Sequence, residues 1–332
     1  MNLLGLEVPI DLKSRRPGLH SFFLLAYALT WALLGPWFYV FNAIYHEKIP
    51  SWLWILAPLA FIGGWGPSVA ALIVTARAGR HGAVRRLMGS LAIWRVPAPW
   101  YVVTFLLPPL VTALSLLIVD AGLAHLRQFD VVRALAGVPV TYMLALPFGP
   151  LGEELGWRGF ALPRLLVRFG PVKASLLLGC VWTFWHLPMM LWSPGASIPS
   201  FMTLSMTSVA MYWVQITAIT ALMTVLFLHT KGSVLLAVLA HLTFNTAEAV
   251  LFGGLPQLAA GQQRAVYIVN VGLLAILGLM SLCWLAARSK KPVAASREPG
   301  QQTSGQQKGV ISPECSRARQ KRTRHNNSGR PD

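Results

Sequence analysis

The sequence predicts an all-α polytopic membrane protein, folded as a bundle of about eight transmembrane helices. Of its 332 residues, 55% are hydrophobic and only 12% are charged, whereas a soluble domain usually has about a quarter charged residues. Apolar runs recur along nearly the whole chain, and each is close to the roughly 20 residues that cross a bilayer as a helix. This composition argues against an ordinary soluble enzyme.

Eight apolar runs have the length of a membrane span. They cover approximately residues 19–45, 52–76, 99–119, 138–162, 172–192, 203–228, 233–252 and 265–287. We therefore expect residues 1–287 to form the transmembrane domain. Residues 288–332 are rich in Gln, Ser, Gly and Arg and have few apolar residues, so this segment cannot bury a core and is predicted to be a basic, disordered cytoplasmic tail.

The positions of the 28 Lys and Arg residues predict the orientation in the membrane. With the N-terminus inside, 24 of them fall in inner segments and 4 in outer segments, and the ratio without the tail is still 13 to 4. Lys and Arg are held on the cytoplasmic side of membrane proteins. We therefore expect a multi-pass protein of the cell membrane with both termini in the cytoplasm.

Two basic segments suggest contacts with lipid. Residues 77–96 place Leu87, Leu91 and Trp94 at helical spacing among arginines, which favours a helix on the membrane surface over an ordinary basic loop. The tail carries a local charge of +8. Beside a cytoplasmic leaflet such a tail meets anionic lipid head groups or remains solvated, so we expect no specific nucleic acid, although its basic runs leave that alternative open.

The three cysteines predict neither a disulfide framework nor a thiol nucleophile. Cys180 and Cys283 lie in predicted spans and Cys315 lies in the tail, so none has an evident oxidised partner. Cys180 and His186 are six residues apart, which places them on different faces of one helix.

Two adjacent acids lie in a predicted span, in the stretch PFGPLGEELGWRGFALPRLL (147–166). A carboxylate in hydrocarbon costs several kcal/mol unless it has a partner. Arg158 is four residues after Glu154 and can form an ion pair with it along one helix face, but it is five residues from Glu153. The spacing therefore predicts that Glu154 is ionised and structural, whereas Glu153 is available as a base.

The residues before these acids predict an interrupted helix. Pro147 and Pro150, with Gly149 and Gly152 between and after them, favour a helix that breaks and restarts just before the pair. The backbone amides of the restarted helix would moderate the cost of the negative charge.

Two later spans carry further polar residues. His186 lies in VWTFWHLPMM, and His241 with Asn245 lies in LAVLAHLTFNTAEAV, where a spacing of four puts both on one helix face. A single buried histidine is usually a satisfied core residue, and a single Asn in a span usually joins two helices. Together with the Glu-Glu-Arg set, however, these residues favour one common site.

These residues carry a family resemblance. Glu153-Glu154-x-x-x-Arg158, then His186, then His241-x-x-x-Asn245 resemble the three ordered motifs of the CAAX prenyl endopeptidase and bacteriocin-processing family of intramembrane glutamic proteases. In that family the second motif is usually Phe-x-x-x-His, whereas Trp182 stands four residues before the histidine here. Another bulky aromatic residue is expected to fill the same packing role.

The resemblance implies a polar intramembrane active site that hydrolyses a peptide bond. Glu153, assisted by His186, would deprotonate a water molecule, and His241 with Asn245 would donate hydrogen bonds to the oxyanion. Glu154 and Arg158 would support this geometry. No metal or cofactor is implied. The substrate would be a membrane-associated peptide or protein, for which a prenylated C-terminus is one possibility.

Other interpretations of the same residues remain open. Two histidines and a glutamate also suit a catalytic zinc ion, although the sequence has no HExxH motif. Ionisable residues inside a helical bundle also serve proton-coupled transporters, and a toxin-peptide immunity factor would not need proteolysis; no repeated halves of a transporter are evident. Glu248 follows His241 by seven residues, so it either extends the polar lining or reaches the membrane interface.

Overall fold

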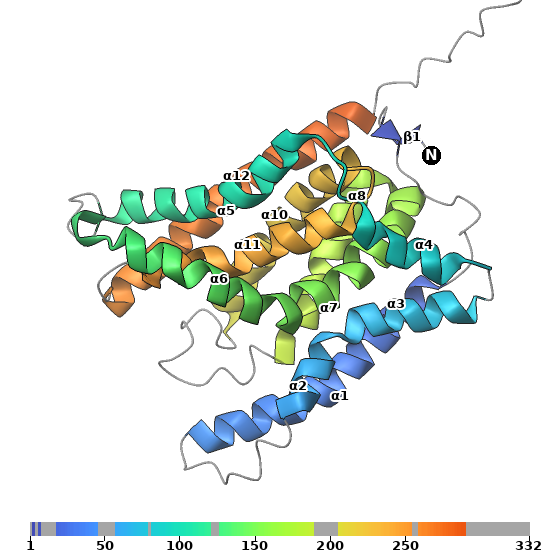
Figure 1. Cartoon of the computed structure of the whole chain (residues 1–332), viewed down its shortest axis with the longest axis horizontal. Helices are drawn as coiled ribbons and strands as arrows, with labels where there is room; N and C mark the ends of the chain where they lie inside the picture. The colour runs from blue at the N-terminus through green and yellow to red at the C-terminus, as the bar shows by residue number, and fades with distance from the viewer. Residues whose placement is uncertain are drawn as a thin grey trace, which may run out of the picture. The chain divides into compact units, whose positions relative to one another are not determined.

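The computed structural model describes residues 2–3, 6–7, 18–45, 57–78, 81–120, 126–188, 205–253 and 258–289. Nearly all of these residues are helical (Figure 1), so the all-α class is confirmed. Two strands of two residues each, β1 (Asn2–Leu3) and β2 (Leu6–Glu7), form a small antiparallel pair that the sequence did not predict. The tail beyond residue 289 lies outside the described residues.

The helices follow one another along the chain with short connections. The α-helices are α1 (Leu19–Tyr45), α2 (Ala57–Gly64), α3 (Gly66–Arg77), α4 (Ala83–Gly89), α5 (Ala98–Val119), α6 (Val131–Phe148), α7 (Pro150–Glu154), α8 (Leu162–Trp185), α10 (Met206–His229), α11 (Val234–Gly253) and α12 (Ala260–Ser289). Shorter segments are the 3₁₀ turns η3 (Ser90–Ala92) and η4 (Leu126–Gln128) and the π-helical η5 (Leu155–Ala161).

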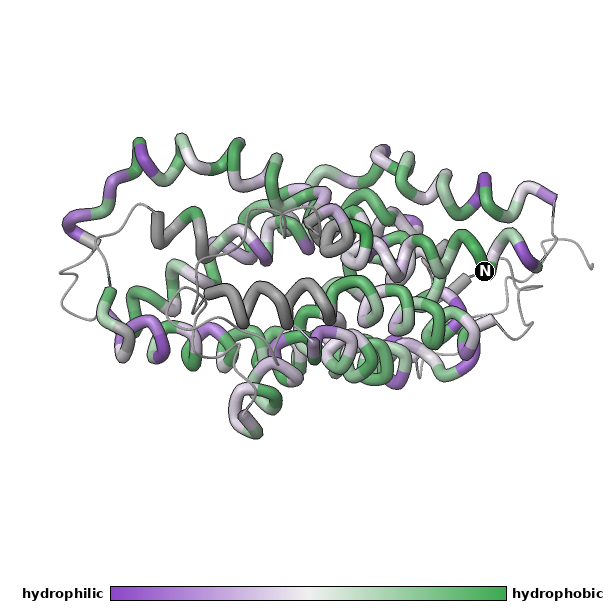
Figure 2. Tube along the Cα trace, turned by 90° about the horizontal axis from the view of Figure 1, so that it is seen from below, coloured by the Kyte–Doolittle hydropathy of each residue, from purple (hydrophilic) through white to green (hydrophobic). Residues whose placement is uncertain are grey.

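Several helices have the length and apolar composition of membrane spans, which confirms the polytopic membrane class. Within the described residues, four stretches are long enough to cross a bilayer: Ala98–Val119, Val131–Trp185, Met206–His229 and Gly261–Ser289. Leu19–Leu34 and Val234–Ala247 are shorter apolar helices. The stretch Val131–Trp185 covers the predicted span 138–162 and much of 172–192. Figure 2 shows hydrophobic residues along most of the length of the helices.

Two predicted boundaries differ from the observed ones. Helix α6 begins before residue 138, because the Asp130 side chain caps it by accepting a hydrogen bond of 2.9 Å from the Arg133 amide. The predicted span 52–76 is divided at Trp65 into α2 and α3, and Pro67 lies in the first turn of α3, where its missing N–H costs nothing.

The predicted helix break before the two glutamates is present. Gly149 has φ −154° and ψ −78°, which separates α6 from α7. The chain becomes helical again at once, since the Glu153 amide donates to the Gly149 carbonyl at 2.9 Å. The indole N–H of Trp65 donates to the Pro147 carbonyl at 2.9 Å. This hydrogen bond satisfies one of the carbonyls at the end of α6.

Two glycines bring α3 close to the segment that carries the glutamates. A Cβ added to Gly152 would lie 3.0 Å from the Gly64 carbonyl oxygen and the Trp65 ring, and one added to Gly156 would lie 2.5 Å from the Pro67 carbonyl oxygen. Side chains at these positions would clash with the backbone of the neighbouring helix. The two glycines therefore allow α7 and η5 to pack directly on the N-terminal end of α3.

Small residues also join the helices of the core. Helix α10 packs against α8, α11 and α12, and α11 packs against α5 and α6. A Cβ added to Gly179 of α8 would lie 2.8 Å from Thr217 Cα, and one added to Gly278 of α12 would lie 2.6 Å from Ala218 Cα. Small residues allow such close backbone contact between membrane helices.

The basic segment 77–96 is helical over α4 and η3. Leu87 is buried, Leu91 packs against the core and Trp94 is 58% exposed. The helical conformation expected here is confirmed over residues 83–92, while its position on a membrane surface remains a prediction.

Candidate active site

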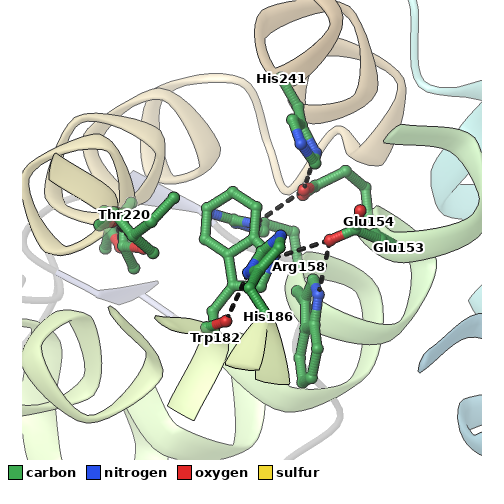
Figure 3. Close-up of polar contacts among 10 residues, drawn as sticks. Glu153, Glu154, Arg158, Trp182, His186, Thr220 and His241 are labelled. Atoms are coloured by element: carbon green, nitrogen blue, oxygen red, sulfur yellow. Dashed lines mark hydrogen bonds and ion pairs between the residues drawn. The ribbon is translucent and has the colours of Figure 1, made fainter. Parts of the chain in front are cut away.

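The two adjacent glutamates are both buried and occupy different environments (Figure 3). Glu153 is 4% exposed and Glu154 is fully buried. Glu154 Oε1 accepts a hydrogen bond of 2.7 Å from Arg158 Nη1, and the arginine side chain is also fully buried. The ion pair predicted from the spacing of four residues is therefore present.

Glu154 has a second partner that the sequence did not predict. His241 Nδ1, on α11, lies 2.9 Å from the same oxygen, Glu154 Oε1. Because a carboxylate accepts, Nδ1 carries the proton and Nε2 is the nitrogen left for another partner. No spacing rule relates these two residues, since 87 positions separate them. Glu154 thus joins α7 to α11 and shares its charge between a guanidinium and an imidazole.

Glu153 is held by two tryptophans. Its Oε2 accepts a hydrogen bond of 2.7 Å from Trp182 Nε1 and one of 3.2 Å from Trp157 Nε1. The sequence analysis missed both contacts, although Trp157 follows Glu153 by four residues, a spacing that could have revealed it. Trp182 comes from α8 and was expected to contribute packing alone.

The second oxygen of Glu153 faces the helix break. A Cβ added to Gly149 would lie 3.2 Å from Glu153 Oε1 and 3.9 Å from Asn245 Nδ2. Both polar atoms therefore approach the same side of Gly149. Asn245 is exposed, in contrast to the buried glutamates, so this side of the cluster is the accessible one.

His186 lies at the C-terminal end of α8, next to Trp182. It is 8% exposed, and its Nδ1 lies 2.8 Å from the Trp182 carbonyl oxygen. Because a carbonyl accepts, the proton is on Nδ1, and Nε2 of the neutral ring is free to accept one. The ring also contacts Tyr212 edge to face at 5.3 Å between centroids. The hydrogen bonds of both histidines bypass Glu153: His186 contacts a backbone carbonyl, and His241 contacts Glu154.

The aromatic ring of Trp182 compensates for part of the burial of Arg158. The guanidinium carbon lies 4.3 Å from the ring centroid, a distance at which a cation is attracted to the ring face. Arg158 Nε, Arg158 Nη2 and Glu154 Oε2 are buried without a hydrogen-bond partner among the described residues. The ring face therefore lies beside a cation whose hydrogen bonds are incomplete.

The described residues contain no group of three or more His, Cys, Asp or Glu placed to hold a metal ion. The two nitrogens and the oxygens that a zinc ion would use are partly engaged, since His241 Nδ1 binds Glu154 and Glu153 Oε2 binds two indoles. The side chain of Glu248, a further candidate for the polar lining, lies outside what the structure describes.

The comparison with known families agrees with this geometry. Residues 135–247 match the family described as type II CAAX prenyl endopeptidase Rce1-like. The chain therefore contains an Rce1-like domain. The matched segment includes both glutamates and both histidines, together with Arg158 and Asn245, so the family resemblance of the motifs is confirmed.

One curated relative of the Rce1-like domain is CAAX prenyl protease 2 of Methanococcus maripaludis. It is 30% identical over 153 residues, which represent 45% of this chain and 55% of that protein. The chain thus spans about half the length of the curated relative that it matches.

Proposed function

We propose that this protein is an intramembrane endopeptidase that hydrolyses a peptide bond of a membrane-associated peptide or protein. The observation that carries this proposal is the separation of two adjacent buried carboxylates into different roles. Glu154 is shared between Arg158 and His241, whereas Glu153 is fixed through one oxygen only and directs the other toward Gly149. Neighbouring carboxylates in different environments can act separately, one as a base and one as a support.

In the proposed reaction Glu153 acts as the base. A water molecule next to Oε1 loses a proton to Glu153 while its oxygen attacks the peptide carbonyl carbon. His186 assists through Nε2, the nitrogen left free by the contact of Nδ1 with the Trp182 carbonyl. The carbon–nitrogen bond of the tetrahedral intermediate then breaks, and the proton passes from Glu153 to the leaving amine. The products are a free carboxylate and a free amine.

His241 and Asn245 would stabilise the oxyanion of that intermediate. The amide of Asn245 approaches the same side of Gly149 as the base does. For His241 to donate through Nε2 its ring must be protonated, and the carboxylate of Glu154 at Nδ1 favours that charged form. Arg158 keeps Glu154 ionised and in place. Glu154 thus acts through His241 and makes no contact with the substrate.

The proposed setting is the cell membrane, with both termini in the cytoplasm and anionic lipid head groups near the basic segments. The name of the archaeal relative refers to prenylated CAAX sequences. A farnesylated peptide that ends in a CAAX sequence is therefore the first probe to use, and the same peptide without the lipid shows whether the prenyl group matters.

The test measures cleavage of both peptides by the purified full-length protein in lipid vesicles. We expect the unchanged protein to release the C-terminal fragment and the Glu153→Gln variant to lose nearly all activity. Asp130→Asn is the matched control, because it also removes one carboxylate, but from an exposed helix cap that Asn can replace. Full cleavage by Glu153→Gln would remove the proposed base. Failure of the unchanged protein on both peptides would favour a transport or immunity role.

A further inference from the structure

Trp182 contacts four polar residues of the candidate site. Its indole N–H donates to Glu153 Oε2 at 2.7 Å, and its ring lies against the guanidinium of Arg158. The His241 ring meets it edge to face at 5.0 Å between centroids, and its backbone carbonyl accepts from His186 Nδ1. The side chain is 1% exposed. A residue that only filled space would need none of these polar contacts.

The indole N–H contributes what a phenyl ring in the same place would lack. A buried carboxylate is costly unless N–H or O–H groups donate to it. Glu153 Oε2 has two donors, and the shorter hydrogen bond is the one from Trp182. With Oε2 engaged in this way, the carboxylate plane is fixed and Oε1 points toward Gly149.

The two indoles differ in what they can position. Trp157 lies one helical turn after Glu153 on the adjoining segment η5, so its hydrogen bond cannot set the place of α7 relative to another helix. Trp182 belongs to α8 and is separated from Glu153 by 29 positions. His186 lies one turn further along α8, with Nδ1 on the Trp182 carbonyl. The position of one tryptophan therefore sets the position of the glutamate relative to the histidine.

We infer that Trp182 is a positioning residue of the proposed peptidase: its indole N–H holds the Glu153 carboxylate in register with His186. This inference rests on the proposed function, in which these two residues activate the water molecule. It assigns to the tryptophan a role that depends on one N–H group and not on the size of the ring.

The test replaces that N–H group alone. Site-specific incorporation of the benzothiophene analogue of tryptophan at position 182 keeps the two-ring shape and puts sulfur in place of N–H. We expect kcat on the peptide probe to fall about tenfold or more with KM nearly unchanged, because a hydrogen bond to a charged group is lost from the reacting arrangement. Trp182→Phe should lose at least as much activity.

The matched control is the same analogue at position 185. Trp185 Nε1 is buried without a hydrogen-bond partner among the described residues, so replacing its N–H by sulfur should leave kcat unchanged. Equal losses at both positions would show that the analogue disturbs packing. Full activity with the analogue at position 182 would overturn the inference.

A second measurement does not depend on proteolysis. Thermal unfolding in detergent is compared for the analogue at position 182, for Glu153→Leu, which removes the acceptor, and for both changes together. We expect the effects on Tm to be non-additive, because both changes remove the same hydrogen bond. Additive effects would overturn the inference. Non-additive effects in a protein that cleaves neither peptide would leave the hydrogen bond in place and refute the proposed reaction instead.

Discussion

His241 and Arg158 bind the same oxygen atom, Oε1 of Glu154, at 2.9 and 2.7 Å. One carboxylate therefore ties together three helical segments, because Glu154 lies on α7, Arg158 on η5 and His241 on α11. Removing its charge would leave a guanidinium and an imidazole next to each other in a buried place. The neighbouring Glu153 has no such role, which makes the two acids separable by experiment.

Glu154→Gln should lower both stability and activity, whereas Glu153→Gln should lower activity alone. Breaking a buried ion pair typically costs about 3–5 kcal/mol, and the glutamine would also lose its hold on His241. Thermal unfolding of both variants in detergent, together with peptide cleavage, measures the difference. An unchanged Tm for Glu154→Gln would show that the ion pair contributes nothing to the fold.

Asn245→Ala should reduce kcat on the order of 100-fold, which is the typical effect of removing one donor to an oxyanion. The side chain is exposed, so the effect on the free energy of unfolding should stay within about 0.5 kcal/mol. Asn245→Asp provides the control, because it keeps the size and loses the amide donor, and it should be equally impaired. If either variant kept normal turnover, Asn245 would have no part in the reaction.

Gly149→Ala should abolish cleavage without unfolding the protein. At φ −154° the backbone of residue 149 suits any amino acid, but the added methyl group would lie 3.2 Å from Glu153 Oε1, where the attacking water is proposed to bind. Gly137→Ala is the control, since a Cβ there meets no atom within 4 Å. Normal cleavage by Gly149→Ala would mean that the water approaches Glu153 from another direction.

Strong zinc chelators should leave cleavage undiminished. The atoms that would bind a metal ion are already used within the protein, because Glu153 Oε2 accepts from two indoles and His241 Nδ1 binds Glu154. The measurement is turnover of the purified protein before and after dialysis against chelator. Loss of activity that added zinc restores would contradict the glutamic-protease mechanism.

Contacts within one helix could be predicted from the sequence, and contacts between helices could not. The ion pair of Glu154 with Arg158 follows from a spacing of four residues, and the break at Gly149 follows from the prolines around it. The hydrogen bond from Trp157 to Glu153 has the same spacing and was available to the same rule.

The contacts of Trp182 with Glu153 and of His241 with Glu154 depend on how α8 and α11 lie against α7. A hydrophobic pattern predicts that these helices exist, but it does not predict their relative rotation, because apolar residues surround each of them. The motif pattern placed Trp182 next to the site. It did not reveal the direction of the indole N–H, which depends on the rotamer.

The contact between Gly156 and Pro67 bears on mutational tolerance. The Pro67 carbonyl oxygen would lie 2.5 Å from any Cβ at position 156, so every substitution there must separate η5 from α3. That displacement would reach both glutamates, which immediately precede η5 in the chain. Position 156 can therefore be as restrictive in a saturation mutagenesis screen as the charged residues, although a glycine contributes no functional group to the reaction.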